Sequence, residues 1–409
     1  MTVVLIYRFL LFLFCGSAVG TRAVLFPIKL QPAAAALFAA AATDGICETM
    51  VKTRGYACEE HKVTTQDGYI LGMQRIPVGR SGGASEKRPP VLLQHGLFGD
   101  GASWLLLPPE QSLAFALADN GFDVWLANTR GTSYSLGHSS LNHSNRVYWT
   151  WSWDELASSD LPAMFKYVHS KTGQKLHYVG HSQGTLIALA ALSKHQLLDI
   201  WKSAALLSPI SYLSHITSKL ARAAAESMIA DASYWLDLGE FNPTGQPEFK
   251  LIMDICQKPG IDCSDLLSAF AGPNCCLNST VLGNILSHGA QSTATQNMIH
   301  LAQMITEGTL AMYDYKDKNE NKKHYGQSTP PAYDLASIPN DFPLFVSHGG
   351  ADALSDVKDV KILLGSLKNH VPNKLEVLFI EKYAHVDFIL GVNAKKVVYD
   401  PLIAFLKRQ

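Results

Sequence analysis

The sequence shows no excess of either charge. Its 409 residues include 34 Lys and Arg against 35 Asp and Glu, which gives a formal net charge of −1. A surface that binds nucleic acid, or an acidic solvating tail, would leave a clear imbalance, so we expect neither, and no nucleic-acid partner. Charged residues are also few, at 17% against 47% apolar residues. This composition excludes a disordered chain and predicts a large buried core.

Long apolar runs are missing after the first residues, and no internal repeat is visible. No later stretch reaches the ~18 apolar residues that a membrane-spanning helix needs. At the start, Arg8 precedes an apolar run over 9–14 that small residues follow, which is typical of a secretory signal peptide. We expect this signal over 1–20, and the alternative is an uncleaved N-terminal anchor. The predicted location is the secretory pathway, with the extracellular space, lysosome or vacuole as the destination.

Cysteine is scarce, and Cys15 would be removed with the signal. Six cysteines remain, two near the mature N-terminus and four in a short later stretch: Cys47, Cys58, Cys256, Cys263, Cys275 and Cys276. An even number in an oxidising compartment predicts disulfides, but their pairing stays open, and buried free thiols are the alternative. The adjacent Cys275 and Cys276 are expected to point in different directions. The spacing of the six suits no zinc site, so we expect no metal.

Two Asn-x-Ser/Thr triplets are present in the chain, and they begin at Asn142 and Asn278. In a secreted protein such triplets are glycosylation acceptors where they are exposed. Because they also arise often by chance, each one is a weak signal by itself.

The order of short apolar runs predicts an α/β fold. A hairpin is expected over 59–78, and short buried strands are expected over 91–93, 122–127, 176–179, 204–207, 342–346 and 375–380. Helical patterns lie between several of these strands, over 112–120, 159–171 and 184–195. Short buried strands that alternate with helices indicate βαβ units and a mostly parallel sheet that is covered on both faces.

This alternation is interrupted between 210 and 339. The segment contains Ala-rich helix, the four later cysteines and a polar stretch, and we interpret it as an insertion between two strands of the sheet. It would be a cap that covers a substrate, and the alternative is an appendage that only adds stability. The predicted division is a signal peptide, a poorly ordered leader, a core in two parts and a cap: 1–20, 21–46, 47–209 with 340–409, and 210–339.

The motif Gly180-His181-Ser182-Gln183-Gly184 is the most specific chemical signal. An apolar run precedes it and an Ala- and Leu-rich helical pattern follows, which is the context of a nucleophile elbow. The glycines would let strand and helix approach closely, so that Ser182 is exposed on a strained turn at a helix N-terminus, which favours developing negative charge. A tight structural turn is the alternative. His181 is not expected to be the base, because neighbours at an elbow point apart.

Acyl transfer at such a serine needs two N–H donors for the oxygen of the tetrahedral intermediate. The first should be the backbone N–H of Gln183, the residue after the nucleophile. The second is predicted in the loop after the strand at 91–93, where Gly96 would let the Leu97 amide face the site. An ordinary glycine-rich turn is the alternative. His95 is expected to be a structural partner of this loop.

The acid and the base should follow the serine in chain order. Asp352 lies in the loop after the strand at 342–346 and is the predicted acid. Asp341 is a weaker candidate because it precedes that strand and so lies at the wrong edge of the sheet. Asp356 is interpreted as a charge at the start of the next helix.

His385 follows the last predicted strand and is the predicted base. It would take the proton of Ser182, while Asp352 would fix its tautomer and stabilise the imidazolium. The alternative for His385 is an ordinary histidine in a surface loop. Asp387 is interpreted as a local turn or helix charge.

Three alternating tryptophans, Trp149, Trp151 and Trp153, precede two acidic residues. Core packing is favoured for the tryptophans over an aromatic surface that contacts lipid. Asp154 and Glu155 are interpreted as charges at the start of a helix.

These motifs together resemble the acid lipase group of the α/β-hydrolases, which includes gastric and lysosomal acid lipases and plant triacylglycerol lipases. The matching segments are Gln66-Asp67-Gly68-Tyr69-Ile70-Leu71, Gln94-His95-Gly96-Leu97, Leu126-Ala127-Asn128-Thr129-Arg130-Gly131, Trp153-Asp154-Glu155, 180–184, Gly349-Gly350-Ala351-Asp352 and His385-Val386-Asp387-Phe388. The resemblance runs from about 48 to the C-terminus, with a gap over the insertion. It implies an α/β-hydrolase fold with a helical cap, and hydrolysis of long-chain lipid esters without a metal or cofactor. It also implies Leu97 and Gln183 as the oxyanion donors.

The chain departs from this family pattern in two places. The stretch 98–102 differs from the animal enzymes and looks closer to plant members, and the four-cysteine cluster has no counterpart in the animal enzymes. The substrate preference of the animal enzymes is therefore not carried over.

The sequence thus predicts a secreted serine lipase that forms an acyl-enzyme on Ser182 and releases it with water activated by His385. Its partner is a lipid ester at a lipid droplet or membrane surface, and the protein is expected to be a monomer. A lipid acyltransferase on the same triad is one alternative, because an alcohol can replace water. A non-catalytic lipid-binding protein on the hydrolase fold is the other.

Overall fold

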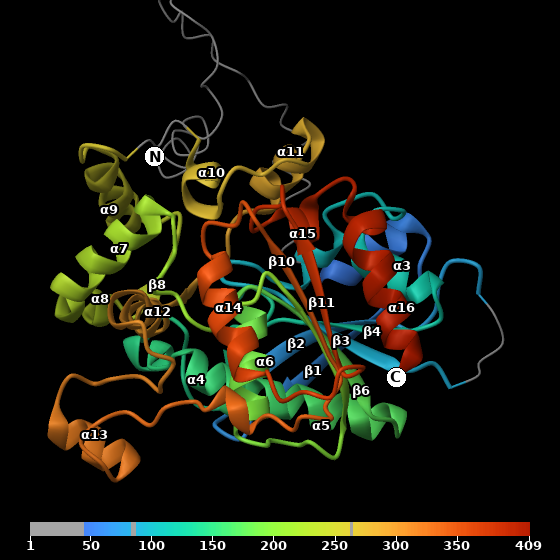
Figure 1. Cartoon of the computed structure of the whole chain (residues 1–409), viewed down its shortest axis with the longest axis horizontal. Coiled ribbons are helices and arrows are strands. Elements are labelled where there is room, and N and C mark those ends of the chain that lie inside the picture. The colour runs from blue at the N-terminus through green and yellow to red at the C-terminus, as the bar shows by residue number, and fades with distance from the viewer. Residues whose placement is uncertain (1–44, 83–86, 262–264) are drawn as a thin grey trace, which may run out of the picture.

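The computed structural model describes residues 45–82, 87–261 and 265–409 (Figure 1). The predicted signal peptide, most of the predicted leader and Cys263 lie outside these ranges. Ile46, the last residue of the predicted leader, is buried in the core. Cys47 and Cys58, which follow it, form a disulfide.

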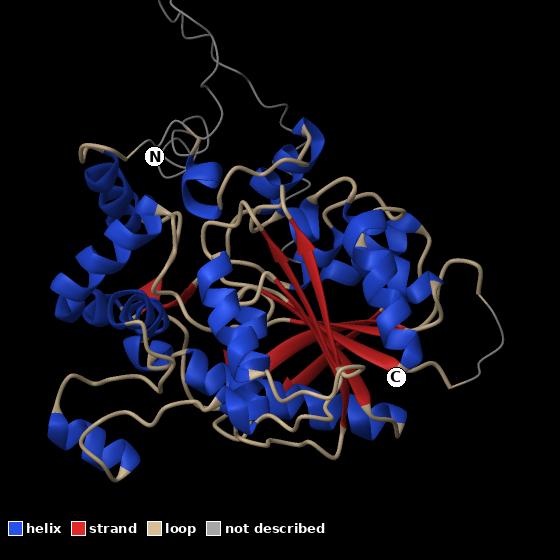
Figure 2. Cartoon of the chain, viewed as in Figure 1, coloured by secondary structure: helices blue, strands red, loops and turns tan. Residues whose placement is uncertain are grey.

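A nine-stranded sheet forms the centre of the molecule (Figure 2). Its strands are β1 (Glu59–Thr64), β2 (Tyr69–Ile76), β3 (Pro90–Gln94), β4 (Asp123–Ala127), β5 (Gly137–His138), β6 (Leu176–His181), β7 (Trp201–Leu207), β10 (Leu344–Gly349) and β11 (Leu375–Ile380). They lie in the order β1-β2-β4-β3-β6-β7-β10-β11, and β5 pairs with β2. The neighbours from β4 to β11 are parallel, whereas the pairs made by β2 are antiparallel. The predicted, mostly parallel α/β architecture is confirmed.

Helices cover both faces of this sheet (Figure 2). Outside the insertion they are η1 (Cys47–Val51), η2 (Lys52–Arg54), η3 (Gly101–Leu105), α3 (Leu113–Asp119), η4 (Arg146–Trp149), α4 (Trp153–Glu155), η5 (Leu156–Asp160), α5 (Leu161–Thr172), α6 (Gln183–Ser193), α14 (Val357–Ser366), α15 (Asp387–Leu390), η7 (Lys395–Tyr399) and α16 (Asp400–Arg408). Leu92 of β3 packs in an apolar cluster with α5 and α6, while Val91 and Leu93 pack in a second cluster with α3 and α16. Successive side chains of a strand point to opposite faces, so both faces of β3 are buried and its sequence is continuously apolar.

The strand predicted over 342–346 begins two residues later than expected, at Leu344. Pro343 has no N–H to donate to a ladder, so regular pairing starts after it. At the other end, the strand continues through His348 to Gly349, because it pairs with β11 along its whole length.

The predicted insertion lies between β7 and β10. Its elements are α7 (Lys219–Ala230), α8 (Ala232–Leu238), β8 (Glu240–Phe241), α9 (Gln246–Cys256), α10 (Leu266–Ala271), α11 (Ser279–His288), β9 (Thr293–Ala294), α12 (Thr295–Glu307), α13 (Lys318–Tyr325) and η6 (Leu335–Ser337). In Figure 1, α10 and α11 lie beyond the C-terminal ends of β10 and β11, and α7, α8, α9 and α12 lie to one side of the sheet. The insertion is therefore placed at the edge of the sheet where the predicted site residues lie.

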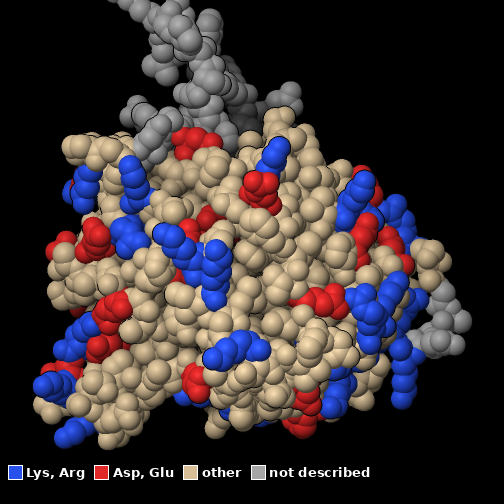
Figure 3. All heavy atoms as spheres, viewed as in Figure 1, with Lys and Arg blue, Asp and Glu red and all other residues tan. Residues whose placement is uncertain are grey.

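Positive and negative side chains are interspersed on the face of the molecule seen in Figure 3, in keeping with the net charge near zero. Asn142 and Asn278 are both exposed, and their glycosylation stays a prediction. In the described part of the chain, no helix combines the length and the apolar character that crossing a bilayer requires.

The three alternating tryptophans are buried in the main apolar cluster, so their predicted role in core packing is confirmed. Glu155 forms a capping box with Ser152 at the start of α4, as expected for a charge at a helix start.

Asp154 lies in the first turn of α4, as interpreted, but its carboxylate also bonds to residues outside this helix. It is buried, and it accepts hydrogen bonds from Tyr313 N (2.8 Å) and the hydroxyl of Tyr333 (2.6 Å) in the insertion. Burial raises the pKa of Asp154 to about 6, although these bonds oppose the rise. These two hydrogen bonds of Asp154 therefore connect the insertion to the core.

The motif that contains Arg130 forms a buried ionic junction. The Arg130 side chain is 1% exposed and bonds to the fully buried Asp160 through Nε (2.7 Å) and to Asp67 through Nη1 (2.6 Å). Its guanidinium also lies over the ring of Tyr69, 3.7 Å from the centroid. The junction connects the β1–β2 turn, the loop after β4 and η5.

We expect Arg130→Met to lower the free energy of unfolding by about 3–5 kcal/mol, because it leaves the buried Asp160 carboxylate without a counter-charge. Urea unfolding followed by circular dichroism measures this change. Arg146→Met is the matched control: Arg146 pairs with Asp237 at the surface, and its loss should cost at most about 1 kcal/mol. Equal stability losses in the two variants would contradict the importance of the buried junction.

Candidate active site

Ser182 occupies the sharp turn between β6 and α6. β6 ends at His181 and α6 begins at Gln183, and the backbone of Ser182 has φ 54° and ψ −123°. A non-glycine residue in this region is strained by on the order of 1–3 kcal/mol, so the surroundings must enforce it. A Cβ on Gly180 would lie 2.7 Å from the backbone carbon of Gly184, so glycine is needed for strand and helix to approach this closely. The predicted strand–turn–helix context of Ser182 is confirmed.

Ser182, His385 and Asp352 meet at the C-terminal edge of the sheet. The hydroxyl of Ser182 lies 2.7 Å from His385 Nε2, and His385 Nδ1 lies 3.0 and 3.1 Å from the two carboxylate oxygens of Asp352. The three residues follow β6, β11 and β10, respectively, and all three are buried. The structure thus brings together the three side chains that the sequence analysis proposed as a triad.

The carboxylate of Asp352 is held ionised by its surroundings. It accepts the backbone N–H groups of Leu354 (3.0 Å) and Ser355 (2.8 Å) besides the bonds to His385. Burial by itself raises the pKa of Asp352, but the charge and hydrogen bond of His385 and the two N–H groups outweigh burial and keep this pKa below its usual value. Asp352 therefore stays negative and fixes the His385 proton on Nδ1.

The two competing aspartates lie apart from this triad. Asp356 is the N-cap of α14, where its side chain accepts the N–H of Lys358 at 2.8 Å, in agreement with its interpretation. Asp341 is exposed and precedes β10.

His181 supports the backbone of His385. Its Nε2 donates to the backbone carbonyl of His385 at 2.9 Å, and the hydroxyl of Ser208 donates to the same oxygen at 3.2 Å. Burial, followed by the charge of His385, lowers the pKa of His181 to about 3, so this ring is neutral near neutral pH. As predicted, His181 packs beside the elbow and its side chain forms no bond with the Ser182 hydroxyl.

His95 holds the loop that was predicted to carry an oxyanion donor. Its Nδ1 donates to the carbonyl of Gly96 at 2.8 Å, and its Nε2 accepts the N–H of Thr129 at 3.2 Å. Burial lowers the pKa of His95. The neutral ring therefore connects the loop after β3 to the loop after β4, as expected for a structural partner.

The backbone N–H groups of Leu97 and Gln183 have no hydrogen-bond acceptor among the described residues. Both residues line the cavity that contains Ser182. Gly96 lies directly against Ser182, because a Cβ at this position would be 2.7 Å from the Cβ of Ser182. Two unpaired donors beside a serine hydroxyl are what an oxyanion needs.

A mostly apolar cavity of about 340 Å³ opens onto Ser182 and His385. Its walls come largely from the insertion, and they include Ala224, Met228, Phe270, Ile285, Met298 and Leu301. A cavity of this size and character matches a small apolar ligand or part of a larger one.

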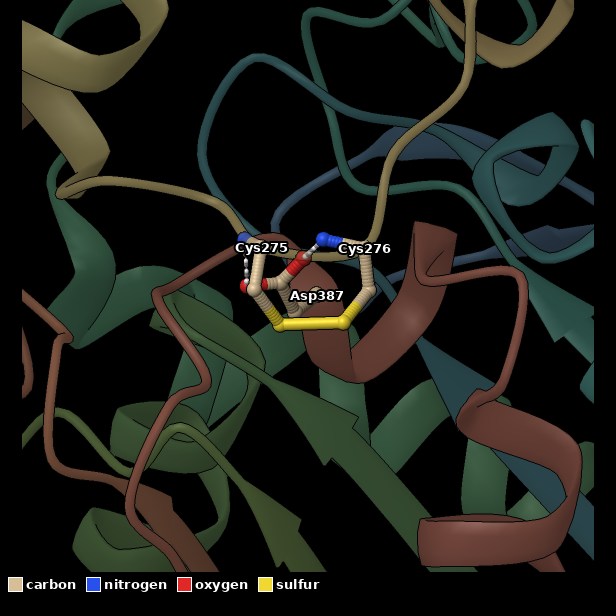
Figure 4. A group of neighbouring side chains, drawn as sticks. All are labelled: Cys275, Cys276 and Asp387. Carbon is tan, nitrogen blue, oxygen red and sulfur yellow. Dashed lines mark hydrogen bonds between the residues drawn. A yellow bond between two sulfur atoms is a disulfide. The ribbon is translucent and has the colours of Figure 1, made fainter.

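Asp387 and the two adjacent cysteines anchor the loop of His385 (Figure 4). The buried carboxylate of Asp387 accepts the N–H groups of Ala384 (2.8 Å), Cys275 (3.1 Å) and Cys276 (3.1 Å). Cys275 and Cys276 form a disulfide with each other, so the expectation that they point in different directions is wrong. Asp387 is likewise not merely a local turn charge, because two of its three partners lie in the insertion.

The same three residues form a group that is close enough to hold a metal ion. Thiolates are the form in which cysteine binds metals, and the two sulfurs are joined to each other instead. Cys256 is also disulfide-bonded.

One backbone carbonyl of the insertion joins the loops of the acid and the base. The carbonyl of Ala271 accepts the N–H groups of His385 (3.1 Å) and Ala353 (3.3 Å). This contact could not be predicted from the sequence, because any residue has a backbone carbonyl. The position of Asp387, two residues after the predicted base, was the available signal for its role.

The chain matches two protein-family models. One, a partial alpha/beta-hydrolase lipase region, matches residues 47–107, and the other, the alpha/beta hydrolase fold, matches residues 89–392. Among solved structures, the chain resembles "Lipase (Open form)" with a TM-score of 0.54 at 14% identity, covering 86% of this chain and 99% of that one. A soluble variant of monoglyceride lipase from Saccharomyces cerevisiae has a TM-score of 0.53 at 17% identity, covering 85% and 94%.

Sequence relatives extend along almost the whole chain. Triacylglycerol lipase 2 of Arabidopsis thaliana is 53% identical over 371 residues, which is 90% of this chain and 89% of the relative. Human lipase member K is 38% identical, covering 86% and 88%, and rat gastric triacylglycerol lipase is 37% identical, covering 87% and 90%.

Gly96→Ala should slow the reaction of Ser182 with a fluorophosphonate probe about 100-fold, since the added methyl group displaces the loop with the Leu97 N–H from the developing oxyanion. The rate of labelling in a stopped time course measures this effect. The matched control is Gly365→Ala on α14, where an added Cβ meets no atom within 4 Å. A Gly96→Ala protein that is labelled as fast as this control would argue against a role for the loop.

Proposed function

The chain belongs to the lipase family of the α/β-hydrolase fold, and on this premise we propose that Ser182, His385 and Asp352 catalyse its reaction. As a member of this family it is a carboxylic ester hydrolase that acts on lipid esters. The observation that carries the proposal is the unbroken line of hydrogen bonds from the hydroxyl of Ser182 through His385 to Asp352.

The first half of the proposed reaction forms an acyl-enzyme. His385 Nε2 takes the proton of the Ser182 hydroxyl, and the oxygen attacks the ester carbonyl. Asp352 keeps the other imidazole proton on Nδ1 and stabilises the imidazolium. The imidazolium then gives its Nε2 proton to the departing alcohol, and the acyl group remains on Ser182.

The second half releases the fatty acid. Water loses a proton to the same Nε2 and attacks the acyl carbon, and Ser182 leaves with that proton. In both halves the carbonyl oxygen becomes an oxyanion, which we assign to the backbone N–H groups of Leu97 and Gln183. The N-terminus of α6 adds its partial positive charge at the same place.

The apolar cavity supports a lipid as the acyl donor. Burial of apolar surface is worth about 25 cal/mol per Å², so aliphatic walls favour a hydrocarbon chain over a polar acyl group. Because these walls come largely from residues 210–339, we propose this segment as the cap, with 47–209 and 340–409 as the core. Within the lipid esters, we propose triacylglycerol or sterol ester as the substrate.

The cellular setting is proposed on separate grounds. The Cys47–Cys58 disulfide supports an oxidising compartment, and with it the predicted secretory pathway. Asn142 and Asn278 are exposed and are proposed as its glycosylation sites. A lipid droplet or membrane surface would present the ester to a monomeric enzyme.

Ser182→Ala should reduce fatty-acid release from a triacylglycerol emulsion by about 10⁵-fold or more, because the nucleophile is lost while binding remains. Titration of the released acid at constant pH measures this rate. Ser193→Ala, at the other end of α6, is the matched control and should keep wild-type activity.

Activity of Ser182→Ala within tenfold of the wild type would exclude the proposed mechanism. Adding glycerol or a sterol to the assay separates hydrolysis from acyl transfer, and free fatty acid should remain the main product. A folded wild-type protein that a fluorophosphonate fails to label at Ser182 would point to a lipid-binding protein instead.

A further inference from the structure

A short part of the insertion, residues 284–291 at the end of α11, bonds directly to the loop that carries the Leu97 amide. We call these residues the α11 clamp. Gln291 N donates to the carbonyl of Phe98 at 2.9 Å, and the Nδ2 of Asn284 donates to the carbonyl of Leu106 at 2.8 Å. The clamp lies outside the sheet and therefore bonds both to the loop that carries the Leu97 amide and to the segment that follows this loop.

The loop needs such support because its backbone is strained. Phe98, the residue after Leu97, has φ 62°, a left-handed conformation that costs roughly 1–2 kcal/mol for a residue with a side chain. Its ring stacks on Phe241 of the insertion, with centroids 5.7 Å apart. Both the carbonyl and the side chain of Phe98 are thus held from the insertion.

The third contact of the clamp is between ionisable groups. His288 Nε2 lies 2.8 and 3.0 Å from the two carboxylate oxygens of Asp100, which is fully buried. Asp100 also accepts the N–H of Ala102 and is the N-cap of η3. A buried carboxylate is strongly destabilised without a counter-charge, so the ionic state of His288 decides how firmly this contact holds.

The surroundings of His288 favour its charged form. Burial lowers the pKa of His288, but the hydrogen bond and charge of Asp100 outweigh burial, and the pKa is raised. Among the described residues, Asp100 is the only charged group that acts on the pKa of His288, and the charge of Asp100 also acts on His95 and Tyr134. The charge-assisted contact is complete below the usual pKa of histidine and weakens as the pH rises through the raised value.

We propose that His288 is a positioning residue, whose protonated ring holds Asp100 and the 97–100 loop so that the Leu97 N–H is aimed at the oxyanion in acid. The inference rests on the proposed role of Leu97. His288 itself touches neither the reacting atoms nor the triad, and it acts through Asp100. Loss of its charge loosens the loop, so the rate of the chemical step falls towards alkaline pH. His288 also lines the cavity, but the walls of the cavity are mostly apolar, so we expect substrate binding to change little.

The test measures kcat and KM against pH on a soluble short-chain nitrophenyl ester, with rates normalised to the number of sites that a fluorophosphonate labels. His288→Gln keeps a donor but never carries a charge, and we expect its kcat in acid to fall about tenfold at an unchanged KM. Its kcat should also lack the alkaline decline that we expect for the wild type. His288→Lys keeps the charge and should extend the wild-type activity to higher pH.

The matched control is His215→Gln. His215 also lies in the insertion and also contacts an aspartate, Asp359 at 2.7 Å, but this pair lies outside the α11 clamp and the 97–100 loop. Its pH profile should equal that of the wild type. Asp100→Asn removes the negative charge of the same contact, and combined with His288→Gln it should add little further loss.

Two results would overturn the proposal. The first is a pH profile of His288→Gln that equals the wild-type profile, with kcat within twofold. The second is a double variant whose loss of kcat equals the sum, in free energy, of the losses in His288→Gln and Asp100→Asn. Failure of the proposed function can be distinguished from failure of this inference. If the proposed function is wrong, Ser182→Ala retains esterase activity, whatever the pH profiles of the His288 variants. If His288→Gln does not fold, the pH profile of Asp100→Asn replaces it, and a profile equal to that of the wild type, with kcat within twofold, would overturn the proposal.

Discussion

The site depends on one close approach, the 2.7 Å hydrogen bond between the Ser182 hydroxyl and His385 Nε2. These two residues are 203 positions apart in the chain, and they meet because β6 and β11 end at the same edge of a parallel sheet. Gly180 and Gly96 leave the space for this approach, since a side chain at either position would displace the strained turn. The geometry of Ser182 is thus a property of the backbones around it.

Buried polar groups keep this edge rigid. The backbone of His385 is bonded through its carbonyl to His181 and Ser208 and through its N–H to Ala271, so its imidazole has little freedom to turn away. A low pKa keeps His181 neutral, and a neutral ring with its proton on Nε2 is the form that donates to a carbonyl. The arrangement holds the proposed base in place without adding a second positive charge beside the imidazolium.

The insertion supports the site from two sides, and in doing so it connects substrate binding with the geometry of the reaction. On one side, Ala271 and the Cys275–Cys276 pair are bonded to the loop that carries His385. On the other side, His288 and Gln291 are bonded to the loop that carries Leu97. Most residues that line the apolar cavity and those that orient the two loops therefore belong to the same segment, and a shift of this segment would change both.

The sheet, the elbow and the candidate triad of Ser182, Asp352 and His385 could be predicted from the amino-acid sequence, because these features are encoded locally. Apolar runs mark buried strands, glycines mark tight turns, and the chain order of parallel strands limits which loops can meet. The contacts of Asp387, Asp154 and His288, and the pairing of Cys275 with Cys276, became known only from the folded chain. Each of these depends on a partner far away in the chain or on a backbone group that any residue carries. Such contacts follow from how the insertion packs on the core, which no local pattern records.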